Sequence, residues 1–199
     1  MSFRYCCLVT RLAAIGLGAN LSSPAGPPPQ TLLAAIDALA ESGDLVGRSS
    51  LYITEPVGVA DQPAFVNAAV TFSTPLDPER LLDRLLSIER RFGRDRSLSA
   101  PNGPRTLDLD LLLLDDLVLD SPGLVVPHPA LAERRFVLAP LAEIAPRLRH
   151  PVLGKTIADL LAALPDEGPN RIESVRRLYT PESWPSTPAS QPGSPGTPV

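Results

Sequence analysis

Apolar residues in this chain fall into short runs separated by longer segments in which they recur every three or four positions. The short runs predict strands over residues 12–17, 45–53 and 65–72. A fourth strand is expected to begin near Leu107 and to end at Leu114, where a run of leucines stops. Proline and glycine are concentrated between these runs, as is typical of loops.

The longer segments have the spacing of amphipathic helices. One helix is predicted over residues 30–41, with Gly43 as its stop. A second should begin at Asp77 and Pro78, a favoured N-cap and first helical residue, and end at Gly93. The order strand–helix–strand–strand–helix–strand predicts an α+β fold with a ferredoxin-like βαββαβ core. Both helices should cover one face of an antiparallel sheet, leaving the other face, or a cleft beside it, for ligands.

After Leu114 the pattern is less regular. We expect a turn at residues 115–116, a short strand over 117–119 and a loop at 125–129. Helices are predicted over 136–144 and 157–164, the second with Thr156 as its N-cap. From Thr180 onward the chain is rich in Pro, Ser and Thr and is expected to be disordered. The chain thus divides into an N-terminal extension (1–11), one domain (12–165) and a C-terminal extension (166–199).

Composition narrows the functional classes. A formal net charge of −4 and a pI near 5.2 argue against a nucleic-acid binder with a broad basic face. No stretch approaches the roughly 20 apolar residues of a membrane span, so no membrane partner is expected. Cys6 and Cys7 are adjacent and offer no disulfide framework, and Arg11 interrupts the early apolar run. These features favour a cytoplasmic protein.

Asp108 and Asp110 carry the most chemical information in the sequence. On a strand, residues two apart share a face, so the two carboxylates would point the same way with Cα atoms roughly 6.5 Å apart. Leu107, Leu109 and Leu111 would face the core. Two charges on a half-buried strand are costly without a cation. The spacing suits a pair of Mg²⁺ ions, which lie about 3.5–4 Å apart in two-metal sites and commonly bind phosphates.

Arginines surround this motif. Five lie between Glu89 and the aspartates: Arg90, Arg91, Arg94, Arg96 and Arg105. They are compatible with a polyphosphate clamp, because guanidinium binds phosphate oxygens in bidentate fashion. The simpler alternative remains open at this stage: an Asp-x-Asp can be the polar face of an edge strand, and some of the arginines can be solvated charges at a helix end. The only histidines, His128 and His150, form no cluster with cysteine, which argues against zinc.

Several segments together resemble one known family, the folate-pathway pyrophosphokinases acting on 6-hydroxymethyl-7,8-dihydropterin. The matching segments are residues 15–21 (IGLGANL), 54–58 (TEPVG), 61–70 (DQPAFVNAAV), 103–110 (GPRTLDLD) and 126–129 (VPHP). The resemblance runs in matching order from about Ala13 to Leu164, and the GPRTLDLD segment is highly specific. It implies a ferredoxin-like fold, a monomer, and transfer of the β,γ-pyrophosphoryl group of ATP to the pterin hydroxymethyl oxygen, with release of AMP.

The resemblance also implies roles for single residues. Asp108 and Asp110 would bind two Mg²⁺ ions and, with Arg94 and Arg105, form the catalytic group. The ATP-binding residues implied are Glu89, Arg94, Arg96, Arg105, His128 and Arg134. The pterin-binding residues implied are Thr54, Glu55, Val57, Phe65, Asn67 and Phe136, with Asn67 reading the pterin edge and the two phenylalanines stacking on its faces.

Two positions depart from the family pattern and two other functions stay open. The family often has an aromatic residue near Asn102, and some members have tyrosine where Pro129 stands. The loops 55–63 and 95–103 are expected to act as lids that exclude water. A two-metal strand on a ferredoxin-like sheet also fits nucleotidyl transfer, and the fold alone fits a non-catalytic ligand-binding domain.

Overall fold

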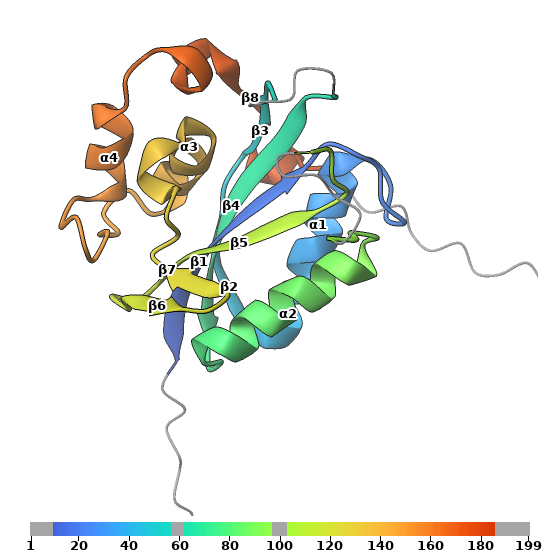
Figure 1. Ribbon diagram of the computed structural model, residues 1–199. Helices are drawn as coiled ribbons and strands as arrows, with labels where there is room; N and C mark the ends of the chain where they lie inside the picture. Colours follow the sequence, from blue (N-terminus) through green and yellow to red (C-terminus); the bar gives the residue numbers. More distant parts are fainter. Residues whose placement is uncertain (1–9, 57–61, 97–102, 186–199) are drawn as a thin grey trace, which may run out of the picture.

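The computed structural model describes residues 10–56, 62–96 and 103–185 (Figure 1). Its first elements are β1 (Arg11–Ala19), α1 (Pro28–Leu39), β2 (Asp44–Arg48), β3 (Leu51–Thr54), β4 (Phe65–Thr74), α2 (Pro78–Arg91) and β5 (Asp108–Leu114). They are followed by β6 (Leu119–Ser121), β7 (Leu124–Val126), α3 (Arg135–Ile144), α4 (Ile157–Ala163) and β8 (Val175–Tyr179).

The main sheet has the strand order β5-β1-β4-β3-β8, and its pairs are antiparallel. This order, with α1 and α2 as the connecting helices, confirms the predicted α+β fold with a βαββαβ core. Asp77 caps α2 by accepting a hydrogen bond from the Arg80 amide, as predicted. The capping box of α4 at Thr156 and Asp159 confirms the other predicted N-cap.

The predicted strand over residues 45–53 is divided into β2 and β3, which pair with successive parts of β4. The interruption falls at Ser49 and Ser50. The Ser49 amide donates to the Ala69 carbonyl (3.0 Å), and its hydroxyl oxygen accepts from the Ala69 amide (2.9 Å). Ser50 turns instead to Glu143 of α3, to which its amide and hydroxyl both donate. Side-chain oxygens therefore replace part of the ladder, which periodicity does not reveal.

The sheet is covered on both faces. Helices α1 and α2 pack on one face, and α3 and α4 lie on the other (Figure 1). A β-bulge leaves Leu112 without a partner on β1, so Leu112 and its neighbour Leu113 both join the core beneath α3 and α4. The expectation of a face left for ligands therefore holds only for the part of the sheet that α3 and α4 do not cover.

The segment after residue 165 is more structured than predicted. β8 pairs with β3 at the sheet edge, and Trp184 is buried in the core shared with α1 and α2. The Arg48 guanidinium lies 4.7 Å from the Trp184 ring centre. The expectation of disorder is therefore wrong for residues 180–185, which are ordered because the Trp184 ring is buried. Residues 186–199 lie outside the described part of the chain. The short strand expected at 117–119 begins two residues later, as β6, and pairs with β7, which includes the first two residues of the loop predicted at 125–129.

Replacing Trp184 by alanine should destabilise the protein by about 3–5 kcal/mol, because a large buried side chain is removed from a packed core. Urea unfolding followed by circular dichroism measures this. Trp184→Phe, which refills much of the space, is the control and should lose less than half as much. A Trp184→Ala protein as stable as the wild type would show that the last described residues add nothing to the fold.

Candidate active site

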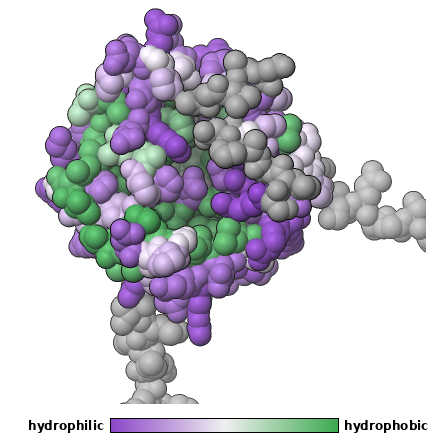
Figure 2. Space-filling model, in the orientation of Figure 1, coloured by the Kyte–Doolittle hydropathy of each residue, from purple (hydrophilic) through white to green (hydrophobic). Residues whose placement is uncertain are grey.

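A cavity opens where the free part of the sheet face meets the start of α3. It is lined by residues from β1, β3, β4, β5 and the turn before β8. Most of the predicted site residues line it: Thr54, Glu55, Phe65, Asn67, Arg105, Asp108, Asp110, Arg134 and Phe136. On the outer face drawn in Figure 2, hydrophilic and hydrophobic residues are intermixed. Strands far apart in sequence thus bring the two predicted halves of the site, carboxylates and aromatics, to one cavity.

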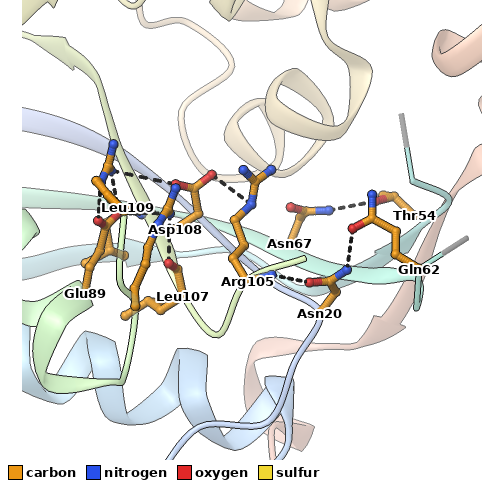
Figure 3. Close-up of polar contacts among 11 residues, drawn as sticks. Asn20, Thr54, Gln62, Asn67, Glu89, Arg105, Leu107, Asp108 and Leu109 are labelled. Carbon is orange, nitrogen blue, oxygen red and sulfur yellow. Dashed lines mark hydrogen bonds and ion pairs between the residues drawn. The ribbon is translucent and has the colours of Figure 1, made fainter. Parts of the chain in front are cut away.

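Asp108 lies among arginines (Figure 3). Its Oδ1 accepts a hydrogen bond from Arg94, and its Oδ2 lies 3.3 Å from Arg105 Nε. Arg96 Nη2 lies 4.0 Å from Oδ1. Among the described residues, the buried Nε atom of Arg94 makes no hydrogen bond, and that of Arg105 has the ion pair with Asp108 but no hydrogen bond of good geometry.

Asp110 differs from its neighbour. Its carboxylate makes no hydrogen bond or ion pair in the described part of the chain, although it lines the same cavity. Burial, followed by the charges of Asp108 and Glu89, raises the pKa of Asp110 from 3.8 to about 6, against the opposing effect of Arg105 and Arg134. A half-buried carboxylate next to a second one is a donor set that favours a hard divalent cation. The pair therefore fits the predicted Mg²⁺ chemistry.

Glu89 is the most enclosed charged residue near the site, with 1% of its surface exposed. Its Oε1 accepts from the Leu109 amide (2.9 Å), Arg96 Nη2 (2.9 Å) and Arg94 Nη1 (3.2 Å), and its Oε2 accepts from Arg96 Nε (2.9 Å). Glu89 thereby joins the end of α2 to β5 and holds two arginines near the aspartates (Figure 3). Direct contact between Glu89 and ATP stays a prediction.

Glu89, Arg94 and Arg96 line a second hollow, beside Gly93 and Asp95, rather than the main cavity. His128 is not among the lining residues of either hollow. Its amide donates to the Leu112 carbonyl (2.9 Å), and its Nδ1 accepts from the Ala130 amide (3.1 Å). Burial, then the charge of Arg134, lowers the pKa of His128. The ring is therefore favoured in its neutral form, with Nδ1 already engaged.

The same cavity also carries the amide and aromatic groups, with Asn67 and Asp108 on either side of Gly18 of β1. Asn67 Nδ2 donates to Thr54 Oγ1 (2.7 Å), so these two predicted residues support each other. The backbone of Gly18 approaches closely, since a Cβ there would lie 2.9 Å from Asn67 Oδ1. Each predicted stacking ring faces a guanidinium, with Arg105 5.0 Å from the Phe65 centre and Arg134 5.7 Å from the Phe136 centre.

Sequence reasoning did not assign Asn20, which is buried at the end of β1. Its Oδ1 accepts from the Arg105 amide (2.7 Å), and its Nδ2 donates to Gln62 Oε1 (3.1 Å) and the Pro63 carbonyl (3.0 Å). Asn20 thus ties the entry of β5 to the entry of β4 (Figure 3). The available signal was a polar amide directly after a buried strand, within the matching segment 15–21.

Glu133, Pro169 and Asn170 also line the cavity and were not predicted. The predicted Val57 and Asn102 lie outside the described residues, as do most of both predicted lid loops. Pro129 is exposed. Within the described ranges, no group of three or more His, Cys, Asp or Glu is arranged to hold a metal, so a metal here would rest on the two aspartates and on groups of the substrate. No helix in these ranges is long and apolar enough to cross a membrane.

Comparisons with known proteins agree with this geometry. A model of the 7,8-dihydro-6-hydroxymethylpterin-pyrophosphokinase family matches residues 14–146. The 2-amino-4-hydroxy-6-hydroxymethyldihydropteridine pyrophosphokinase of Pseudomonas aeruginosa is 47% identical over 160 residues, covering 79% of this chain and 94% of that protein. Its namesake from Methylorubrum extorquens is 41% identical over 163 residues, covering 81% and 98%.

A solved structure shows the same fold at low identity. The Plasmodium falciparum HPPK-DHPS crystal structure with STZ-DHP has a TM-score of 0.66 and 18% identity, and the match covers 86% of this chain and 47% of that one. This chain therefore spans about half the length of that protein. The family match covers more than half of this chain and includes the Asp108–Asp110 strand. The chain belongs to the 7,8-dihydro-6-hydroxymethylpterin-pyrophosphokinase family and is a pyrophosphokinase.

Proposed function

We propose that this protein transfers the pyrophosphoryl group of ATP to the hydroxymethyl oxygen of 6-hydroxymethyl-7,8-dihydropterin, releasing AMP, in folate synthesis. The observation that carries the proposal is one cavity that is lined both by Asp108 and Asp110 and by Asn67, Phe65 and Phe136. Polyphosphate chemistry and recognition of a flat heterocycle both need these groups. The predicted monomeric state and cytoplasmic location stay predictions.

The reaction forms a bond between the pterin oxygen and the β-phosphorus and breaks the bond from that phosphorus to the oxygen bridging it to the α-phosphate. AMP leaves with that oxygen, and the proton of the pterin hydroxyl group is released to solvent. Such a transfer depends on alignment and charge neutralisation more than on covalent help from the protein. Asp108 and Asp110 would hold two Mg²⁺ ions, which neutralise phosphate charge when bound. Arg94, Arg96 and Arg105 add positive charge close to Asp108.

The pterin end of the cavity supplies orientation. Asn67 can offer both a donor and an acceptor to the heterocycle edge, and its link to Thr54 fixes the amide. Arg105 and Arg134 now lie against the rings of Phe65 and Phe136. Pterin binding between the rings moves these guanidinium groups off the aromatic faces and frees them for the phosphates.

The decisive experiment incubates the purified protein with ATP, MgCl₂ and the reduced pterin alcohol and identifies the nucleotide product. AMP formed only when the pterin is present supports the proposal. Release of pyrophosphate from ATP would indicate nucleotidyl transfer instead. Nucleotide binding without turnover would indicate a ligand-binding domain, and ADP formation would contradict all three.

Replacing Asn67 by alanine should raise the KM for the pterin about tenfold to hundredfold, because one or two hydrogen bonds to a buried heterocycle are lost. The KM for ATP should change less than threefold, because the proposed phosphate-binding groups are the aspartates and arginines rather than Asn67. Steady-state kinetics with each substrate varied in turn provides the test. Thr54→Val, which removes only the support of the amide, should have a smaller effect of the same kind. Equal changes in both KM values would contradict the assignment of Asn67 to pterin binding.

A further inference from the structure

The cavity is completed by residues that lie well beyond the segment matched to the family. That match ends at residue 146, yet Pro169 and Asn170 line the cavity beside Arg134 and Phe136. They form a short turn between α4 and β8. β8 then pairs with β3, so that Val175 stands opposite Thr54 at the other wall. The C-terminal segment therefore lines the cavity at Pro169 and Asn170 and pairs with the strand that lines it at Thr54.

Asn170 makes the specific contacts. Its Oδ1 accepts from the Arg135 amide (2.9 Å), and its Nδ2 donates to the Glu133 carbonyl (2.9 Å). One side-chain amide thus holds the peptide groups on both sides of Arg134. The Arg135 guanidinium in turn donates to the Asn170 carbonyl and to the Leu164 carbonyl (3.4 Å), which anchors the turn from the other direction.

The hydrogen bonds made by the Asn170 side chain replace a local N-cap that α3 lacks. The residue at the N-cap of α3 is Arg134, whose side chain makes no capping hydrogen bond and whose backbone is extended (φ −119°, ψ 111°). The first amide of the helix would otherwise lack an acceptor. Asn170 supplies it from a distant part of the chain and also holds the preceding carbonyl. The backbone direction of Arg134 is then determined on both sides.

Arg134 faces the reacting groups from this position. Its side chain lines the cavity, and its guanidinium lies over the Phe136 ring. Asp108 and Asp110 line the same cavity. A small rotation of the Arg134 backbone would therefore move a charge that both the carboxylate end and the aromatic end of the cavity experience.

We propose that Asn170 is a positioning residue for pyrophosphoryl transfer, which acts by holding Arg134 in place, and that the turn carrying Asn170 is part of the active site. The inference rests on the proposed function. A rival role exists on structural grounds: Asn170 could serve only as a helix cap, stabilising α3 without affecting the reaction. The two roles differ in whether the effect of Asn170 depends on Arg134.

The test is a double-mutant cycle of Asn170→Ala and Arg134→Ala, with kcat/KM for ATP and the pterin as the measured quantity. Asn170→Ala alone should lower kcat/KM about tenfold or more. In the Arg134→Ala background the same change should cost less than twofold, because the group that Asn170 positions is already absent. Thr156→Ala is the matched control: it removes the cap of α4, away from the cavity, and should leave kcat/KM within twofold of wild type.

An Asn170→Ala enzyme within twofold of wild type would overturn the proposal, as would a loss that is equally large without Arg134. If Asn170→Ala does not fold, the cycle is run with Asn170→Asp, which loses the donor to Glu133 and keeps an acceptor for the Arg135 amide. A wild-type protein that forms no AMP would instead refute the proposed function. The double-mutant cycle would then be measured through the dissociation constant of α,β-methylene ATP in the presence of Mg²⁺. A wild-type protein that does not bind this ATP analogue would refute both proposals.

Discussion

The Asp110→Asn protein is expected to lose turnover by at least about a thousandfold and yet to be more stable than the wild type without metal. Turnover falls because one of two carboxylates at the proposed phosphate end is removed. Stability rises because the folded protein keeps Asp110 in a place where its ionised form is unfavourable, next to Asp108 and Glu89. Asparagine has nearly the same shape and carries no charge there.

The effect of Asp110 on the free energy of unfolding depends on pH. The pKa of Asp110 is raised from 3.8 to about 6 on folding, so the folded state holds this proton more tightly than the unfolded state does. The contribution of Asp110 to stability is therefore present below about pH 4, declines as the pH rises through 6, and is lost above it. The full loss is on the order of 3 kcal/mol, since each pKa unit corresponds to about 1.4 kcal/mol.

Urea unfolding of metal-free protein at pH 5 and pH 7.5 measures the effect. The stability gap between Asp110→Asn and wild type should widen toward pH 7.5. Asp116→Asn, a change at an exposed turn, serves as the control and should show the same gap at both pH values. An Asp110→Asn protein that is less stable than wild type at pH 7.5 would mean that the carboxylate has an interaction the structure does not contain.

Replacing Glu89 by alanine should destabilise the protein by about 3–5 kcal/mol and abolish turnover. The side chains of Glu89 and Arg94 are 2% and 9% exposed, so the change leaves a buried guanidinium with one carboxylate partner, Asp108, instead of two, and leaves the Leu109 amide without an acceptor. Arg96, which Glu89 now holds 4.0 Å from Asp108, would lose its main carboxylate contacts and could move toward Asp108. Denaturant unfolding and the AMP assay together test both parts.

Two variants make the Glu89 result specific. Glu89→Gln keeps an acceptor for the Leu109 amide and should lose less stability than Glu89→Ala. Glu41→Ala breaks the ion pair between Glu41 and Arg84, in which the carboxylate side chain is 63% exposed, and should cost no more than about 1 kcal/mol. A Glu89→Ala protein with wild-type stability and activity would show that the arginines do not depend on this carboxylate.

Much of the fold could be predicted from local patterns alone. The leucine run that ends at Leu114, the Asp77–Pro78 helix start and the order of elements each depend on residues close in sequence, and all were confirmed. β8 could not be predicted in this way. It is a mostly exposed strand with two arginines, and it exists because the edge of β3 offers a partner.

The candidate site also has residues that local patterns could predict and residues that they could not. Asp108 and Asp110 were recognisable because their spacing alone puts both on one face of a strand. Asn20 and Asn170 could not be recognised in this way. The side-chain partners of Asn20 lie 42 or more residues away in the sequence, and those of Asn170 lie 35 or more residues away. A single side-chain amide also has no periodic signature. The dependence of Glu89 on Arg94 and Arg96 was similarly hidden, although all three residues had been associated with ATP.

The position of β8 has a consequence for how the chain is made. A ribosome delivers the N-terminal end first, so β3 emerges long before its neighbour at residues 175–179. Until then the newly synthesised chain has an open sheet edge and lacks the turn at Asn170, and unpaired edges invite association with other chains. Nascent chains arrested near residue 165 should therefore engage chaperones, and the released full-length chain, in which β8 and Trp184 can pack, should lose that engagement.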